Sequence, residues 1–268
     1  MSTILTKQIE EGVALVTLNR PERRNALAMD LVIELTEEMK RLRHDRDTRV
    51  VVLNGAGQGF CAGADLVQDG DRPPGAEGMT ELGFIYRMQE HIAEMMIAVH
   101  ELPKPVIAAV HGAAVGGGLA LALASDMRVA ADTAKFGSVF IKVGLSSCDV
   151  GTSYFLPRLV GPGRAFELMT TGRHFDASEA FEMGLVQSVV AEGKEIEKAL
   201  ETARLIVQNN EYGVWMTKSG MWTNLDAPSL RHAMELENRT QVLGTFTGNM
   251  TEAMQAFREK RDPRWKPL

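Results

Sequence analysis

The stretch PVIAAVHGAAVGGGLALALASD, residues 105–126, decides the fold of this chain. Its apolar run Val106–Val110 is rich in β-branched residues and predicts a buried strand, whereas Leu119–Ala124 predicts a helix. Three consecutive glycines, Gly116–Gly118, lie between them and allow a tight turn that a ligand can approach closely. The first N–H groups of a helix lack intrahelical acceptors, and the helix dipole adds positive partial charge there. This turn is therefore predicted to bind an anion or a developing oxyanion.

Three other interpretations of the same stretch compete with an anion site. A membrane-spanning helix is disfavoured by the glycines, by His111 and by the lack of an interfacial Trp or Tyr. A phosphate-binding loop is disfavoured because neither GxxxxGK(S/T) nor GxGxxG occurs in this stretch. Tight packing of a helix on a strand, without any chemistry, stays open. A second hydrogen-bond donor elsewhere in the chain would decide the matter.

A second donor is indicated by the segment GFCAGADL, residues 59–66, which follows the predicted strand Val50–Leu53. The chain also carries the motif NRPERRNAL at residues 19–27. With these motifs it resembles the enoyl-CoA hydratase/isomerase family, the crotonase superfamily, over nearly its whole length. The resemblance implies that the backbone N–H groups of Ala64 and Gly117 hold the thioester oxygen of an acyl-CoA. A preorganised pair of this kind stabilises an enolate or a tetrahedral oxyanion.

The composition sets loose bounds on the size of the core, on the partners and on the compartment of the protein. The chain has 268 residues, 45% of them hydrophobic, which is enough to bury a sizeable core in one main domain. A net charge of −6 without a Lys/Arg stripe disfavours nucleic acid as a partner. The first ten residues have no apolar signal segment, and the two cysteines form no CxxC motif or disulfide framework. We expect a cytoplasmic protein.

The fold class expected from the resemblance is α/β, a crotonase-like spiral of ββα units, since the periodicity alone is also compatible with a Rossmann sheet. We expect an acyl-CoA-binding core at 1–200 and a C-terminal helical trimerisation region at 201–268, where the sequence becomes poor in glycine and rich in helix formers. Further strands are predicted at 3–8, 12–18, 127–130, 135–137 and 186–190. Helices are predicted from an Asp30 N-cap, at 81–102, from Thr152, from an Asp176 N-cap, and at 196–209, 212–222, 229–246 and 251–258.

The residues expected to carry proton transfer depart from the usual family pattern. Hydratases of the family use two glutamates, and the matching positions here hold Ala120 and Phe140, neither of which can transfer a proton. Asp149 is the remaining nearby acid and is similar to the acid of dienoyl-CoA isomerases and of the 4-chlorobenzoyl-CoA dehalogenase branch. The alternative role for Asp149 is structural: its side chain would cap the helix that begins near Thr152. Ser146, Ser147 and Cys148 are expected to serve the turn rather than to act as nucleophiles.

A dehalogenase would also need a histidine on the preceding helix. The matching position is Ala93, and His91 lies two residues away, which turns a helix by about 200°. Dehalogenation is therefore disfavoured.

The resemblance also implies contacts with the acyl-CoA outside the reacting centre. The positions that match substrate- or CoA-binding residues are Arg24, Ala26, Ala62, Asp65, Leu66, Phe140, Phe257 and Lys260. It further implies that coenzyme A is part of the substrate, with no permanently bound cofactor, no metal and no membrane partner. Family members assemble into trimers that often pair into hexamers, so Phe257 and Lys260 are expected to reach CoA across a subunit interface.

Three hypotheses for the function follow. The first is an acyl-CoA enzyme in which Ala64 and Gly117 polarise the thioester and Asp149 is a single acid/base for isomerisation or for hydration of an unusual enoyl-CoA. The second is a thioester hydrolase or a C–C bond-cleaving enzyme. The third is a non-catalytic acyl-CoA binder that has kept the donor pair and lost the acids.

Overall fold

The computed structural model describes residues 2–65 and 73–268. In this part of the chain the strands form a six-stranded sheet, ordered β1-β2-β3-β4-β6-β9, and a three-stranded sheet, ordered β5-β7-β8. The strands are β1 (Ile4–Glu10), β2 (Gly12–Leu18), β3 (Thr48–Gly55), β4 (Val106–Val110), β5 (Ala113–Val115), β6 (Met127–Ala131), β7 (Lys135–Gly137), β8 (His174–Asp176) and β9 (Ser188–Val190). The β1–β2 pair is antiparallel and the rest of the larger sheet is parallel.

The helices alternate with pairs of strands and complete a spiral. They are α1 (Met29–His44), α2 (Glu81–His100), α3 (Gly117–Ala124), α4 (Thr152–Val160), α5 (Pro162–Thr171), α6 (Ala177–Glu182), α7 (Glu195–Val207), α8 (Glu211–Leu225), α9 (Leu230–Thr245) and α10 (Asn249–Glu259), with the 3-10 turns η1 (Pro21–Arg23) and η2 (Val139–Val143). In β4-β5-α3, and again in β6-β7-α4, the first strand joins the larger sheet and the second joins the smaller one. The predicted spiral of ββα units is confirmed.

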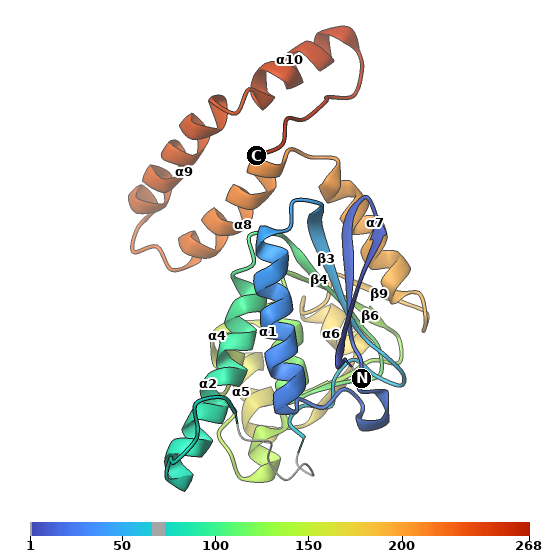
Figure 1. Cartoon of the computed structure of the whole chain (residues 1–268), viewed down its shortest axis with the longest axis vertical. Helices are drawn as coiled ribbons and strands as arrows, with labels where there is room; N and C mark the ends of the chain where they lie inside the picture. The colour runs from blue at the N-terminus through green and yellow to red at the C-terminus, as the bar shows by residue number, and fades with distance from the viewer. Residues whose placement is uncertain (1, 66–72) are drawn as a thin grey trace.

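The two faces of the larger sheet are covered by different helices, as Figure 1 shows. Val51 and Leu53 of β3 belong to the main core with α1, α2 and α3, whereas Val50 and Val52 pack with α7 on the other face. This division follows from the alternation of side chains along a strand. The predicted domain boundary after residue 200 falls inside α7, which still packs on the sheet.

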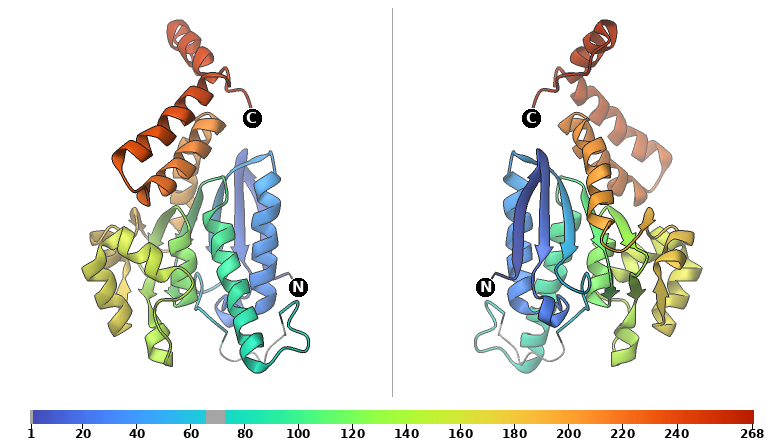
Figure 2. Two further views of the ribbon diagram at one scale, coloured as in Figure 1. Left: turned by 90° about the vertical axis from the view of Figure 1, so that its left-hand side faces the viewer. Right: turned by 90° about the vertical axis from the view of Figure 1, so that its right-hand side faces the viewer.

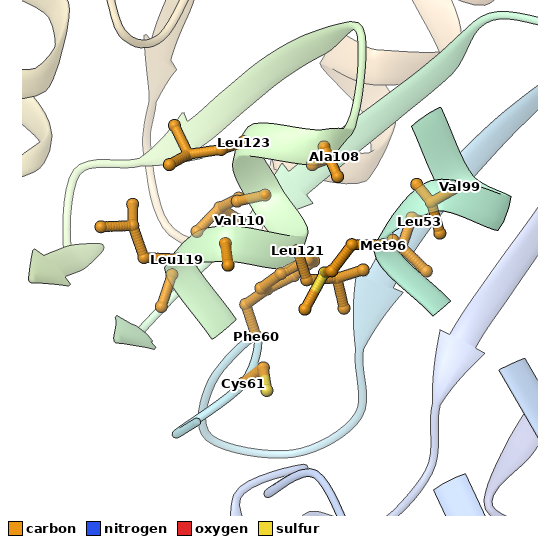
Figure 3. Close-up of a cluster of buried hydrophobic side chains, with 14 of the residues drawn as sticks. Leu53, Phe60, Cys61, Met96, Val99, Ala108, Val110, Leu119, Leu121 and Leu123 are labelled. Atoms are coloured by element: carbon orange, nitrogen blue, oxygen red, sulfur yellow. The ribbon is translucent and has the colours of Figure 1, made fainter. Parts of the chain in front are cut away.

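Helix α3 lies in the centre of the core. All of its residues are buried, as expected for a helix that is apolar on every side. In Figure 3, Leu121 lies close to Phe60 and Met96, while Leu119 and Leu123 point to the opposite side of the helix. The position of α3 is thus fixed by packing all around it, and with it the turn from which it starts.

The far end of α3 is held by a buried arginine that the sequence did not single out. Arg128 is 2% exposed and donates hydrogen bonds to the carbonyl oxygens of Ser125 at 2.6 Å, Ala122 at 3.2 Å and Leu185 at 2.7 Å. Burial lowers the pKa of the Arg128 guanidinium to about 10, so it remains charged at neutral pH. The Arg128 guanidinium gives hydrogen-bond partners to carbonyl groups that the end of a helix leaves without them. Its positive charge also interacts favourably with the negative end of the helix dipole.

Tertiary contacts move several element boundaries from their predicted places. Helix α1 begins at Met29 with Ala28 as its N-cap, not at the predicted Asp30 cap, because a β-bridge between Leu27 and Ala64 keeps the preceding chain extended. Helix α3 begins at Gly117 rather than Leu119. The predicted start of α4 at Thr152 is confirmed, as is the Asp176 cap, whose side chain accepts from the Glu179 N–H at 3.0 Å.

The last three helices form an arm that extends from the core. Figures 1 and 2 show α9 and α10 at the opposite end of the molecule from the amino-terminal end of α1. Within the described residues, none of the helices has the length and apolar character that a membrane span requires.

Candidate active site

The two predicted donor segments meet in the core, and glycine is what allows them to approach. A Cβ atom at Gly63 would lie 2.8 Å from the Val115 carbonyl oxygen and 3.3 Å from the Gly117 nitrogen. One at Gly118 would lie only 2.1 Å from the Cys61 carbonyl oxygen. Gly63 also has a φ of 88°, a conformation that glycine adopts without steric cost. The glycines therefore place residues 63–64 directly beside the start of α3.

The Ala64 and Gly117 N–H groups are open donors on two segments that touch. The backbone groups on either side of the Ala64 N–H form hydrogen bonds with Leu27. The Leu27 N–H donates to the Gly63 carbonyl oxygen at 2.7 Å, and the Leu27 carbonyl oxygen accepts from the Asp65 N–H at 3.3 Å. Gly117 is the first residue of α3, so its N–H has no intrahelical acceptor. Within residues 2–65 and 73–268, neither the Ala64 nor the Gly117 N–H has a hydrogen-bond acceptor. Two open donors on touching segments can hold one substrate oxygen.

Asp149 faces α2, and the capping alternative is wrong. Its carboxylate accepts a short hydrogen bond from the Gln89 side-chain amide on α2. Only its backbone carbonyl reaches α4, accepting from the Thr152 N–H at 2.8 Å, and the N-cap residue of α4 is Gly151, without a side-chain cap. The turn between them is left-handed at Val150, with φ 38°, and at Gly151, with φ 87°. This turn leaves the Asp149 carboxylate free of the helix end.

Gln89 is a candidate site residue that sequence reasoning missed. It lies four residues before Ala93, the position that matches the histidine of the dehalogenase branch, so the i, i+4 spacing was a usable signal. His91 lies on another side of α2, with its Nε2 atom 3.4 Å from the Pro74 carbonyl oxygen. The structure thus agrees with the expectation that His91 points elsewhere.

The two positions that the resemblance matches to the glutamates of hydratases lie in the core. Ala120 is fully buried in α3, and Phe140 in η2 is 8% exposed. Both belong to the main hydrophobic cluster together with Val150, the residue after Asp149. The Gln89–Asp149 hydrogen bond joins α2 to the turn that leads into α4. Both of these helices pack against α3, the helix that carries Gly117.

The hydroxyl groups next to Asp149 make hydrogen bonds with backbone groups, and the two cysteines differ in their exposure to solvent. Ser147 Oγ donates to the Met169 carbonyl oxygen at 2.8 Å, and Ser146 Oγ accepts from the Cys148 N–H at 3.0 Å. Cys148 is exposed, whereas Cys61 is fully buried and burial raises the pKa of its thiol to about 12. A thiol with that pKa stays protonated and unreactive at neutral pH.

Part of the predicted CoA-binding set lies around the donor pair. Arg24 is exposed and its carbonyl accepts from the Ala62 N–H at 3.0 Å, and Ala26 follows on the same loop. The Asp65 side chain is paired with Arg20 at 3.0 Å. Leu66 lies outside the described residues, as does the start of the predicted loop at 67–80.

Phe257 and Lys260 are not brought to the donor pair within one chain. Both are in the last turn of α10 or just after it, and Phe257 is 86% exposed. Helix α10 lies at the far end of the molecule from the start of α1, as Figure 2 shows. The cavities of about 730 and 800 Å³ also lie along α8 and the arm, not beside Ala64 and Gly117.

Comparison with known proteins supports the motifs and the geometry together. Residues 8–267 match the family model described as enoyl-CoA hydratase/isomerase. A probable enoyl-CoA hydratase of Mycobacterium leprae is 43% identical over 251 residues, covering 93% of this chain and 85% of the relative. The 1,2-epoxyphenylacetyl-CoA isomerase of Escherichia coli K12 is 34% identical over 268 residues, covering 99% of each chain. A crystal structure of a probable enoyl-CoA hydratase/isomerase from Mycobacterium abscessus superposes with a TM-score of 0.93 at 40% identity, covering 99% of both chains.

The fold and the donor pair thus define a crotonase-fold protein that acts on acyl-CoA thioesters. The chain belongs to the enoyl-CoA hydratase/isomerase family.

Proposed function

We propose that this protein isomerises an acyl-CoA through a thioester enolate. The backbone N–H groups of Ala64 and Gly117 hold the thioester oxygen, and Asp149 takes a proton from one carbon and returns it to another. No group is gained or lost in this reaction, so one acid/base suffices. The observation that carries the proposal is the pair of open donors on touching segments, with one carboxylate, Asp149, fixed on α2 by Gln89.

Two features favour isomerisation over hydration by the usual pair of acids. Ala120 and Phe140 cannot transfer protons, so the addition of water would have to rely on Asp149 alone. The E. coli relative, 34% identical over 99% of this chain, is named as an isomerase of a CoA thioester. Coenzyme A is proposed as part of the substrate and not as a resident cofactor.

Incubation with acyl-CoA thioesters in heavy water tests the proposal. An isomerase that forms an enolate should incorporate deuterium into the acyl chain, which mass spectrometry detects, without releasing CoA. Release of CoA, followed with a thiol reagent and corrected for the exposed Cys148, would instead support the hydrolase. If the protein binds acyl-CoA tightly but neither incorporates deuterium, releases CoA nor converts any acyl-CoA, the result would support the non-catalytic binder.

Gln89→Leu should lower kcat by about 10-fold, because the Asp149 carboxylate would lose the donor that orients it. KM for the acyl-CoA should change little, since Gln89 holds the acid rather than the thioester. The matched control is Glu94→Leu, an exposed residue of the same helix that should keep full activity. Equal rates for Gln89→Leu and the control would contradict this role.

We further propose that the protein works as a homotrimer or as a hexamer of two trimers. The arm exposes large apolar side chains, among them Leu230, Leu243 and Phe246 at 76%, 61% and 83% exposure, which a partner subunit would cover. A second copy would also bring its Phe257 and Lys260 to a CoA bound near Ala64. Sedimentation of the purified protein tests this assembly, and a stable monomer would contradict it.

Lys260→Ala should weaken acyl-CoA binding about 5-fold at low salt, because the exposed ammonium would lose a contact with CoA phosphates. The loss should shrink as salt screens the charge. Titration calorimetry at two salt concentrations measures it, with Lys198→Ala on α7 as a control for removal of an exposed lysine. Unchanged affinity at low salt in a protein that still assembles would rule out the contact.

A further inference from the structure

A largely buried ion pair involves Asp65, the residue that follows Ala64. The Arg20 guanidinium donates to the Asp65 carboxylate at 3.0 Å and to the Ala26 carbonyl oxygen at 2.6 Å. The Arg20 and Asp65 side chains are only 12% and 5% exposed. One planar cation therefore joins the residue after Ala64 to the residue before Leu27. An arginine fork can do this because it presents several donors in fixed directions.

The same two segments are also joined on the far side of Ala64. Leu27 forms the β-bridge with Ala64 through hydrogen bonds to Gly63 and Asp65. This leaves the Ala64 N–H unpaired, and its direction depends on how the bridge is held. Arg20 donates hydrogen bonds to both segments that form this bridge, to Ala26 on one segment and to Asp65 on the other.

The loop that carries Arg20 is itself fixed by a buried side chain. Asn25 is fully buried, its side-chain oxygen accepts from the Arg20 N–H at 2.9 Å, and its amide donates to the carbonyl oxygens of Ala56 and Gly59, both at 2.9 Å. Asn25 also has φ 56°, which asparagine tolerates better than most residues. The base of the Arg20 side chain is thus anchored to the segment that leads into residues 59–65.

We infer that Arg20 and Asp65 form a positioning pair that sets the direction of the Ala64 N–H toward the substrate oxygen. This role rests on the proposed function and adds to it two residues that do not contact the reacting atoms. Asp65 then serves the site through its ion pair with Arg20. The pair also keeps each charge satisfied in a buried place, where an unpaired charge would be costly.

Arg20→Lys should lower kcat by about 10- to 100-fold with a much smaller change in KM, because a donor misplaced by a fraction of an ångström stabilises the enolate poorly. Lysine keeps the charge but cannot bond both Ala26 and Asp65 in the planar fork geometry. Asp65→Asn, which keeps the side-chain shape, should give a loss of the same kind. The double variant should lose little more than the worse single variant, since both act through one pair.

A spectroscopic measurement separates positioning from mere stability. Infrared difference spectra of hexanoyl-CoA, isotope-labelled at the thioester carbonyl, report how strongly the bound carbonyl is polarised. The wild-type protein should shift the carbonyl stretch to lower frequency, and Arg20→Lys and Asp65→Asn should each lose much of that shift while still folded and binding. The control is Arg204→Lys on α7, which alters an exposed ion pair with Glu10 of β1 and should keep the full shift.

The outcomes distinguish this inference from the proposed function. A wild-type protein without any carbonyl shift would count against the donor pair itself. A wild-type shift that stays unchanged in both folded variants would overturn the positioning role alone. Should Arg20→Lys fail to fold, Asp65→Asn provides the same comparison by itself.

Discussion

Gly117→Pro is expected to lower kcat by about 10²- to 10³-fold, the effect of losing one oxyanion donor. Proline has no N–H, and its ring would occupy the space where the substrate oxygen is bound. The fold should tolerate the change, since Gly117 is the first residue of α3 and has no positive φ. Proline is well accepted at that helical position. Steady-state kinetics with the acyl-CoA that the wild-type protein converts measures the loss.

Gly117→Ala is the matched control for this substitution. Its Cβ atom would meet the same neighbour, Leu27 Cδ1 at 2.7 Å, but it keeps the N–H donor. Because that neighbour is the end of a flexible side chain, we expect a much smaller loss than with proline. If the proline variant is folded and as active as the alanine variant, Gly117 is not an oxyanion donor.

Asp149→Asn should lower the rate of isomerisation by about 10²- to 10⁴-fold, the contribution of a positioned acid/base. The asparagine oxygen can still accept from Gln89, so the contact with α2 is kept while proton transfer is lost. Acyl-CoA affinity and the melting temperature should therefore change little. Turnover, binding and thermal unfolding of the same preparation test all three expectations together.

An aspartate with a purely structural role provides the comparison for Asp149. Asp176 caps α6 through its side chain, and Asp176→Asn should leave turnover and stability close to wild type, because Asn and Asp cap about equally. Full activity of Asp149→Asn would place proton transfer on another group. A large fall in melting temperature would instead indicate that the Gln89 contact needs the charge.

The sequence predicted the backbone part of the site because backbone donors depend on local pattern. A strand, a glycine turn and a helix start together determine where the Gly117 N–H lies, and all three are encoded within residues 105–126. The segment 59–65 could be predicted in the same way, as a turn after β3. Together with the resemblance to the family, these local patterns allowed the donor pair to be proposed before any contact between the two segments was known.

The contacts between side chains in the site could not be predicted, because they join residues far apart in the chain. Asp149 bonds Gln89 across 60 residues, and Asp65 pairs with Arg20 across 45. Local pattern left a helix cap open as the alternative role of Asp149, and the left-handed turn at Val150 and Gly151 removes its carboxylate from the start of α4. Asp30 failed as a predicted cap for a related reason, since the Leu27–Ala64 bridge sets the start of α1.

By itself the sequence determined the glycine turn and the helix start within residues 105–126, because hydrophobic period and glycine placement act over a few residues. Its family motifs, rather than its periodicity, indicated the spiral of ββα units and predicted Ala64 and Gly117 as the donors. The tertiary structure decided which polar side chains meet: Gln89 with Asp149, Arg20 with Asp65, and Arg128 with the end of α3. It also decided that α10, whose C-cap is Lys260, lies at the opposite end of the molecule from the start of α1. Such pairings depend on how helices and loops pack against one another, and a burial pattern along the chain does not specify them.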